Sequence, residues 1–258
     1  MGSVLIAFSG GADSTYLAYV ANSVLGEKAL SVFAHSPVCS PSDLEEAVAL
    51  ATQLGLNFRA IETDELEDPL FVSNTPDRCY YCKQELFHKL KTLAAAERLN
   101  WIADGTNHDD LNDYRPGRRA CREMNIRSPL LEAGITKEEI RQLSQHAGLP
   151  TWDKPASPCL ASRIPYGTPV TSDVLIRIAE GEKYLRSLGL RQLRLRHHGD
   201  IARIEVDPPN MPLIIAGDTR IKLVEKIHGL GYQYVTLDLT GYRTGSLNEI
   251  IVKKKDDS

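Results

Sequence analysis

The sequence predicts an α/β fold, a doubly wound parallel sheet, followed by a second, smaller α+β domain. Three observations lead to this prediction. Short apolar runs alternate with helical patterns through the first half of the chain, and a glycine-rich turn directly follows the first run. After a stretch rich in proline, glycine and serine, Asp153–Pro169, the pattern changes to more closely spaced strands and helices. We therefore expect domains at residues 1–165 and 166–258, with ligands at the carboxyl ends of the parallel strands.

Apolar runs and capping residues predict the elements of the first domain in order. Ser40 before Pro41 has the form of an N-cap followed by proline at the first helical position, and Thr136 with Glu139 forms a capping box. A glycine follows each of the first two expected helices and ends it. The expected elements are strand Val4–Phe8, helix Ser14–Leu25, strand Ala29–Ala34, a helix from Ser40 to Leu54, strand Asn57–Ile61, a polar loop Glu62–Pro76, helix Tyr80–Arg98, short strands Trp101–Asp104 and Asn125–Arg127, and a helix from Thr136 to Gly148.

The second domain is expected to mix strands and helices. Its elements are helix Ser172–Leu188, strands Gln192–Arg196 and Ala202–Val206, a helix near Ile221–His228, and strand Tyr232–Leu237. The charged tail Lys253–Asp257 is expected to be a frayed end.

Composition excludes several classes of protein. Of the 258 residues, 42% are hydrophobic and 25% charged, which is typical of a globular protein. A net charge of −4 argues against a protein that holds nucleic acid through its overall charge. No apolar stretch reaches the roughly 18 residues of a membrane span, and the first residues do not resemble a signal peptide. We expect a cytoplasmic homo-oligomer without nucleic-acid or membrane partners, whose five cysteines are ligands, nucleophiles or buried residues rather than disulfides.

The segment Ser9-Gly10-Gly11-Ala12-Asp13-Ser14-Thr15 directly follows the first expected strand. Two glycines allow the backbone to turn tightly past a bulky anion. The helix that opens at Ser14 points its free N–H groups and its positive dipole end at the same place. A Gly-Gly turn before an ordinary helix could have the same sequence, but the order of strand, loop and helix favours a phosphate-binding loop.

This loop resembles the PP-loop of ATP pyrophosphatases, which cleave ATP to AMP and pyrophosphate while they adenylate a substrate. The resemblance implies a Rossmann-like fold, with ATP and Mg²⁺ as cofactors. It gives Asp13 a catalytic role in holding Mg²⁺. It also implies that the cofactor is bound by Ser9, Gly10, Gly11, Asp13, Ser14 and Thr15.

Three of the cysteines are candidates for a metal or redox site. Cys79 and Cys82 form a C-x-x-C at an expected helix start, and Cys159 lies far along the chain. Such a pair can be a redox dithiol, half of a zinc site, or two corners of an iron–sulfur cluster. A closed zinc site needs four ligands, and no second C-x-x-C is present. Three thiolates can hold a [4Fe-4S] cluster with one iron open. The residues alone leave a metal site, structural thiols and a redox pair open, and Cys39 and Cys121 have no motif around them.

Further motifs carry a more specific resemblance. They are Asp104–Asp110, Asp113–Gly117, Ser128–Leu130, Trp152–Ala156, Cys159–Arg163 and Arg194–Gly199. Their order and wording look like the LarE family of ATP-dependent pyridinium-3,5-biscarboxylate mononucleotide sulfurtransferases, and the match runs through nearly the whole chain. Members of that family adenylate each substrate carboxylate and replace it with a thiocarboxylate, during synthesis of the nickel-pincer nucleotide cofactor. The resemblance implies a small-molecule nucleotide substrate and a sulfide donor as partners.

The resemblance implies two alternative sulfur chemistries. In one, a lone cysteine at the place of Cys159 gives up its own sulfur. In the other, that cysteine joins a C-x-x-C pair to hold a [4Fe-4S] cluster, whose open iron carries sulfide for repeated turnover. Because Cys79 and Cys82 are present, we expect the cluster form, with all three cysteines as metal ligands and Cys159 also catalytic.

The resemblance also implies roles for residues of the substrate and nucleotide sites. Guanidinium groups bind phosphate and carboxylate in a bidentate fork, so substrate binding is expected at Arg163, Arg194, Arg196 and Arg203. A solvated strand face would also explain the alternating Arg194 and Arg196. Glu182 matches a family glutamate near the sulfur site and is expected to be catalytic, although Glu180 is a second candidate. Gly105 is expected to contact the nucleotide, with Asn107 and Asp110 lining its cleft.

Three other functions remain as alternatives. An iron–sulfur PP-loop enzyme that thiolates tRNA would need a broad basic surface, which the acidic balance disfavours. An amide-forming ligase of the NAD or GMP synthetase kind uses ammonia and has no need for three thiols. A non-catalytic sensor of ATP or iron would show no substrate-dependent ATP consumption.

Overall fold

The structure is a computed structural model that describes residues 1–112, 116–155, 157–243, 245 and 247. The chain divides into two compact units, Met1–Ser157 and Pro158–Ser258. The division falls inside the segment Asp153–Pro169 that the sequence marks as a linker. The tail Lys253–Asp257 lies outside the described residues, as do residues 113–115 of one motif.

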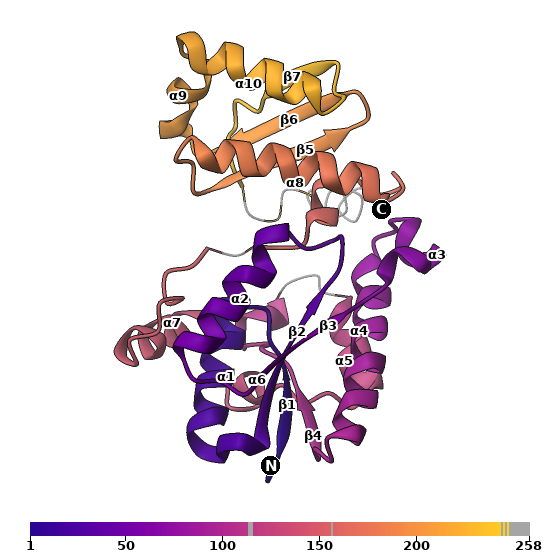
Figure 1. Cartoon of the computed structure of the whole chain (residues 1–258), viewed down its shortest axis with the longest axis vertical. Helices are drawn as coiled ribbons and strands as arrows, with labels where there is room; N and C mark the ends of the chain where they lie inside the picture. Colours follow the sequence, from indigo (N-terminus) through magenta and orange to yellow (C-terminus); the bar gives the residue numbers. More distant parts are fainter. Residues whose placement is uncertain (113–115, 156, 244, 246, 248–258) are drawn as a thin grey trace. The chain divides into compact units, whose positions relative to one another are not determined.

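The first unit contains a parallel sheet of four strands. Their order is β3-β2-β1-β4 (Figure 1). Val4 pairs with Ala29 on one side and with Trp101 on the other, so β1 is central and β4 is its direct neighbour. Since parallel strands end at the same edge, the segments that follow β1 and β4 emerge side by side. The strands are β1 Val4–Ala7, β2 Ala29–His35, β3 Phe58–Glu62 and β4 Trp101–Ala103.

Helices cover both faces of this sheet, as expected for a doubly wound fold (Figure 1). Val4 and Ile6 belong to a buried cluster with residues of α1, α2 and α7. Leu5, between them, belongs to a second cluster with residues of α4 and α5. This alternation is the two-residue period of a strand that is buried on both sides. The helices of the unit are α1 Ala12–Leu25, η1 Gly26–Lys28, α2 Pro41–Gln53, η2 Glu65–Glu67, α3 Pro69–Val72, α4 Arg78–Ala96, η3 Asp109–Asn112, α5 Gly117–Glu123, α6 Pro129–Glu132 and α7 Lys137–His146.

Two expectations for the first unit are wrong. The segment Asn125–Arg127 is not a strand: its described pairing is a single bridge between Ala103 and Arg127. Asn125 has a φ of 54°, and a left-handed residue interrupts an extended segment. The expected loop Glu62–Pro76 contains η2 and α3, because the Asp68 carboxylate accepts a hydrogen bond from the Leu70 N–H and starts a helical turn.

The second unit contains a smaller mixed sheet in the order β5-β6-β7 (Figure 1). β5 and β6 are antiparallel, and β6 and β7 are parallel. These strands and helices confirm the expected smaller α+β unit. Its elements are η4 Leu160–Arg163, α8 Ser172–Ser187, β5 Leu193–His198, β6 Ile201–Val206, η5 Pro208–Asn210, α9 Met211–Ile215, α10 Gly217–Gly229 and β7 Tyr234–Leu237.

One face of β5 packs against α8 and α10. The Leu195 side chain lies beside Gly181 of α8, and Ile227 of α10 approaches the same place. Leu195 and Ile227 are fully buried. Arg194 and Arg196 alternate with Leu195 along the strand and therefore project from the opposite face.

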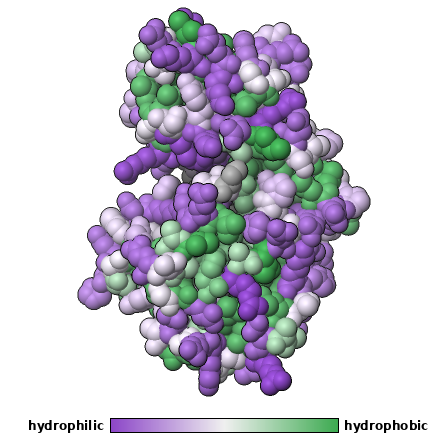
Figure 2. Space-filling model, in the orientation of Figure 1, coloured by the Kyte–Doolittle hydropathy of each residue, from purple (hydrophilic) through white to green (hydrophobic). Residues whose placement is uncertain are grey.

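The surface shown in Figure 2 combines hydrophilic areas with separate hydrophobic patches. Within the described residues, no helix is both long and apolar enough to cross a bilayer.

Replacement of Gly181 by alanine tests the packing of α8 on β5. A Cβ at Gly181 would lie 2.3 Å from Leu195 Cδ1, and the buried leucine has little room to move away. Alanine favours a helix over glycine by about 1 kcal/mol, but overpacking costs about 1–3 kcal/mol. We expect Gly181→Ala to speed hydrogen exchange in β5 and β6 by roughly tenfold.

The matched control is Gly229→Ala, at a helical glycine whose Cβ would meet no described atom within 4 Å beyond its own helix and chain neighbours. This variant should exchange at or below the wild-type rate. Equal hydrogen-exchange rates of β5 and β6 in Gly181→Ala and wild type would contradict the packing of α8 on β5.

Candidate active site

The phosphate loop spans the gap between β1 and α1. Gly10 adopts a φ of 67°, which suits glycine. The Ser14 Oγ accepts a hydrogen bond from the Ser9 N–H at 3.1 Å and lies 3.0 Å from the Ser9 Oγ, so the loop is braced across its own turn. Among the described residues, no side chain caps α1 at Gly11. The N–H groups at the start of α1 are thus available to an anion.

Gly105, which follows β4, lies directly against this loop. A Cβ on Gly105 would lie 3.0 Å from the Ser14 nitrogen and 3.2 Å from the Ser14 Cα. Both neighbours are backbone atoms and cannot give way as a side chain could. The structure thus brings Gly105 and Ser14 together, as expected from the order of the strands.

The buried Asp104 carboxylate holds the segment around Gly105. Its Oδ1 accepts hydrogen bonds from the Ser128 hydroxyl at 2.7 Å and the Thr106 N–H at 3.2 Å. Its Oδ2 accepts from the Thr106 hydroxyl at 2.7 Å and the Cys121 thiol at 3.3 Å. Burial, followed by the charge of Asp104, raises the pKa of Cys121 to about 12. Cys121, for which the sequence offers no role, is therefore a protonated donor to Asp104.

Asn107 and Asp110 stabilise the next turn of the same segment. The Asn107 Oδ1 accepts hydrogen bonds from the N–H groups of Asp109 and Asp110, and the Asp110 carboxylate accepts from the Asn107 N–H. Both side chains are buried. Their contacts fix the turn, and their expected place along the nucleotide cleft stays a prediction.

Two lysines that the sequence analysis missed reach the phosphate loop. Lys137 Nζ lies 2.6 Å from each oxygen of the Asp13 carboxylate. Lys154 Nζ donates to the Gly10 carbonyl at 3.2 Å and to the Glu46 carboxylate at 3.0 Å. Lys137 directly follows a capping residue and Lys154 lies in the motif Trp152–Ala156, but neither pattern alone indicates a partner in the loop.

The contact of Lys137 also tests whether Asp13 suits Mg²⁺. Carboxylate oxygens are the ligands that Mg²⁺ prefers, and here both oxygens already face a cation. The donor type and the attraction for positive charge at Asp13 therefore fit a metal ion.

The C-x-x-C pair lies in the first turns of α4, which begins two residues earlier than expected. Residues three apart share one face of a helix. Cys79 is exposed and Cys82 partly exposed, and the Cys82 thiol donates to the buried Glu65 carboxylate over 3.9 Å. Cys159 belongs to the second unit. The described part of the chain contains no group of three histidine, cysteine or acidic residues placed to hold a metal ion, so the cluster ligands stay a prediction.

In the second unit, Arg163 holds the backbone beside Cys159. This arginine is 1% exposed, and its Nη1 donates to the carbonyl oxygens of Pro158 at 2.5 Å and Cys159 at 3.0 Å. Its Nε and Nη2 form a fork on Glu182, at 2.8 and 3.0 Å. Glu182 thereby fixes the guanidinium that fixes the Cys159 backbone.

Glu182 is fully buried on α8. Its carboxylate also accepts from Arg186 at 3.1 Å and from the Leu195 N–H at 3.2 Å. Burial opposes the charged form, but Arg163 and the neighbouring arginines outweigh it and lower the pKa of Glu182. An ionised carboxylate with both oxygens engaged is suited to positioning Arg163. Its expected catalytic role stays a prediction.

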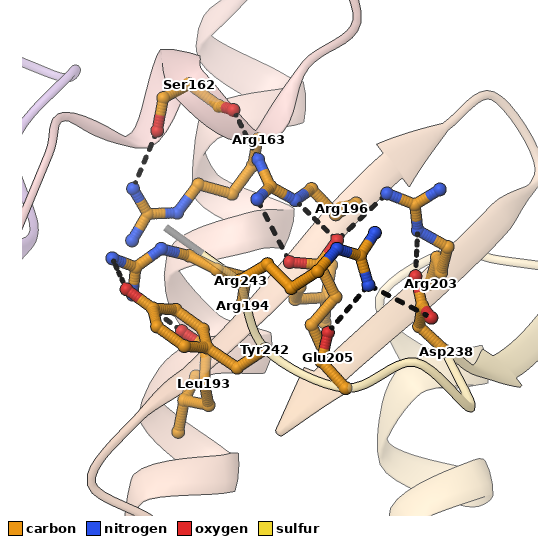
Figure 3. Close-up of polar contacts among 12 residues, drawn as sticks. Ser162, Arg163, Leu193, Arg194, Arg196, Arg203, Glu205, Asp238, Tyr242 and Arg243 are labelled. Carbon is orange, nitrogen blue, oxygen red and sulfur yellow. Dashed lines mark hydrogen bonds and ion pairs between the residues drawn. The ribbon is translucent and has the colours of Figure 1, made fainter. Parts of the chain in front are cut away.

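Further arginines line the charged face of β5 and β6 (Figure 3). Arg196 forms a fork on the buried Glu205 at 3.0 and 2.9 Å and donates to the Ser162 carbonyl at 2.8 Å. Arg203 contacts the same carboxylate at 2.9 Å. Asp238 lies between Arg203 and Arg243, at 3.7 and 3.8 Å. The register pairs Arg194 with Glu205 and Arg196 with Arg203, which confirms that the two β5 arginines share one face.

Arg194 lies at the edge of this group. It donates to the Leu193 carbonyl at 2.6 Å and the Tyr242 hydroxyl at 3.2 Å (Figure 3). Burial, followed by the charge of Arg163, lowers the pKa of Arg194 to about 10. The charges of Arg163 and Arg196 lower this pKa and those of Tyr242 and Glu182 raise it, so Arg194 lies among groups of both signs.

Comparison with known proteins places this chain in a family. The NAD synthase family matches residues 1–80. An uncharacterised protein of Synechocystis sp. is 46% identical over 96% of this chain and 93% of its own length. The pyridinium-3,5-bisthiocarboxylic acid mononucleotide synthase of Lactiplantibacillus plantarum is 40% identical over 97% of this chain and 90% of its own length. This chain belongs to the LarE family.

Membership of the LarE family makes the chain an ATP-dependent, adenylating sulfurtransferase with a PP-loop. An uncharacterised protein of Methanocaldococcus jannaschii is a more distant relative, 29% identical over 93% of this chain and 91% of its own length. The LarE relationship extends through both units, whereas the NAD synthase match ends in the first turn of α4.

Replacement of Gly105 by alanine tests the contact between the two loops. The added methyl group would push the loop after β4 away from the backbone of Ser14. We expect Gly105→Ala to raise the KM for ATP by roughly tenfold, because a shift of under an ångström misplaces the phosphate loop. The control is Gly229→Ala in the other unit, where an added Cβ meets no described atom within 4 Å beyond its own helix and chain neighbours, and it should leave this KM unchanged. An unaltered KM in Gly105→Ala would contradict the contact between Gly105 and Ser14.

Thiol labelling tests the distinct surroundings of the cysteines. In the folded, cluster-free protein at pH 8, iodoacetamide should modify the exposed Cys79. It should spare Cys121, since Cys121 is buried and its pKa is about 12. Peptide mass spectrometry after brief labelling checks both. Rapid labelling of Cys121 without unfolding would contradict its contact with Asp104.

Proposed function

We propose that this enzyme adenylates the carboxylates of pyridinium-3,5-biscarboxylate mononucleotide and converts them to thiocarboxylates, in synthesis of the nickel-pincer nucleotide. The observation that carries the proposal is the identity with the Lactiplantibacillus plantarum synthase, which covers nearly all of both chains and includes both units. The two sites described above are proposed to carry out the two halves of such a reaction.

The first unit is proposed to activate the carboxylate. A carboxylate is a poor electrophile, so one of its oxygens first attacks the α-phosphorus of ATP, and pyrophosphate leaves. The N–H groups at the start of α1 stabilise the charge that develops on pyrophosphate, and Ser9, Gly10, Gly11, Ser14 and Thr15 form the cradle. Lys154 adds a positive charge at this loop. Asp13 is proposed to hold Mg²⁺, which neutralises phosphate charge when bound.

The second unit is proposed to bind the substrate. A mononucleotide with two carboxylates is strongly anionic, and Arg194, Arg196 and Arg203 place guanidinium groups on one partly buried face of the sheet. Two of these arginines are already held by Glu205. They are therefore preorganised and lose little freedom when an anion arrives.

Cys79, Cys82 and Cys159 are proposed to hold a [4Fe-4S] cluster. None of the three is fully buried, and cysteine thiolates are the donors that such a cluster takes. When bound, it would supply sulfide at its fourth iron. Sulfur adds to the activated carbonyl, the bond from carbonyl carbon to the adenylate oxygen breaks, and AMP leaves. Glu182 and Arg163 act as positioning residues by fixing the backbone of Cys159.

The remaining proposals concern the setting of the enzyme. We propose that it works as a homo-oligomer in the cytoplasm and receives sulfide from a separate donor. The net charge of −4 supports a small-molecule substrate rather than a nucleic acid.

Iron analysis combined with cysteine variants tests the sulfur chemistry. Anaerobically reconstituted protein should contain about four irons and four sulfides per chain. With substrate, ATP, Mg²⁺ and sulfide, it should form several thiocarboxylate products per chain. Cys82→Ala should lose the iron and repeated turnover but still form substrate-dependent pyrophosphate, because the phosphate loop is intact.

The matched control is Cys39→Ala, at a half-buried cysteine outside the proposed cluster. It should keep both iron and turnover. Undiminished turnover in Cys82→Ala would contradict the cluster, and a single turnover with loss of the Cys159 sulfur would identify the sacrificial chemistry instead.

A further inference from the structure

Lys137 occupies the place at Asp13 that a metal ion would need. We propose that Lys137 is an internal counter-cation: its ammonium holds the Asp13 carboxylate in the nucleotide-free enzyme, and Mg²⁺ must displace it. The proposal rests on the proposed function in one respect, the assignment of Asp13 as the metal-binding carboxylate.

The geometry makes the two cations compete. Lys137 Nζ is 2.6 Å from both carboxylate oxygens, so it lies in the fork between them. A Mg²⁺ ion in that fork would need the same position. A Mg²⁺ ion on the outer side of either oxygen, at about 2.1 Å, would lie next to an ammonium of like charge. Either way, the lysine weakens binding of the metal.

The fold fixes the backbone of Lys137 close to the phosphate loop. The Lys137 N–H donates to the Asp109 carboxylate at 2.8 Å, and Thr136 caps α7 by a reciprocal pair of hydrogen bonds with Glu139. The His108 N–H donates to the Ile135 carbonyl at 2.9 Å. The start of α7 is thus tied to the segment after β4, which itself lies against the phosphate loop.

The arrangement has a consequence for the order of binding. Without Lys137, the bare Asp13 carboxylate would repel the phosphates of ATP at the mouth of the loop. With Lys137 in place, the carboxylate is neutralised until a metal ion arrives. The displaced lysine stays anchored through its backbone beside the phosphate loop.

Binding of Mn²⁺ to the nucleotide-free, full-length protein tests the proposal, with unbound Mn²⁺ measured by room-temperature EPR. Lys137→Met removes the charge and keeps the length of the side chain. We expect it to bind Mn²⁺ about threefold more tightly than wild type, within the range that partly exposed ion pairs allow. The same variant should form AMP more slowly, since a charge at the phosphate site is lost.

Three further variants separate this effect from a structural one. Lys137→Arg keeps the charge and should show no gain in Mn²⁺ affinity. Asp13→Asn added to Lys137→Met should remove the gain. Lys89→Met breaks a comparable pair with Asp64, 2.5 Å long and in the same unit, and should bind Mn²⁺ as wild type does.

Equal or weaker Mn²⁺ binding by Lys137→Met would overturn the proposal, as would an equal gain in Lys137→Arg. The measurement uses neither ATP nor substrate. Loss of the proposed sulfur transfer would therefore leave this result interpretable, and a failure of the Mn²⁺ test would leave the sulfur chemistry untouched.

Discussion

Contact between two backbones at the carboxyl edge of the first sheet is the constraint on which the nucleotide site depends. Gly105 and Ser14 approach so closely that no side chain fits between them. They meet because β1 and β4 are neighbouring parallel strands, and they stay together because Asp104 holds the second segment with four hydrogen bonds. The helix that carries Lys137 is tied to that same segment, so one contact places both the phosphate loop and its counter-cation.

The second unit depends on buried charge rather than on backbone contact. Burying ion pairs costs desolvation, so the forks on Glu182 and Glu205 contribute little net stability. They serve to position side chains, because each carboxylate fixes a guanidinium in one orientation. Arg163 thereby holds the carbonyl of Cys159, and Arg196 holds that of Ser162. The segment around Cys159 is positioned by charges that belong to a helix and a sheet far along the chain.

Most of the fold follows from local signals, whereas much of the site does not. Alternating apolar strands, the Ser40 and Thr136 caps and the Gly-Gly turn predict the first unit, and the LarE motifs identify the family. The contacts of Lys137 with Asp13 and of Lys154 with Gly10 join residues 124 and 144 positions apart, which no local pattern contains. No local pattern predicts that Glu182 is fully buried, because burial depends on packing partners elsewhere in the chain.

The proposed reaction depends on transfer of AMP from ATP to a substrate carboxylate. The most direct measurement supplies substrate whose carboxylates carry ¹⁸O and determines the isotope in the AMP released during thiolation. If a carboxylate oxygen attacks the α-phosphorus and sulfur later breaks the bond between that oxygen and the carbonyl carbon, each AMP gains one ¹⁸O. AMP without the label, or release of ADP in place of AMP, would contradict the account.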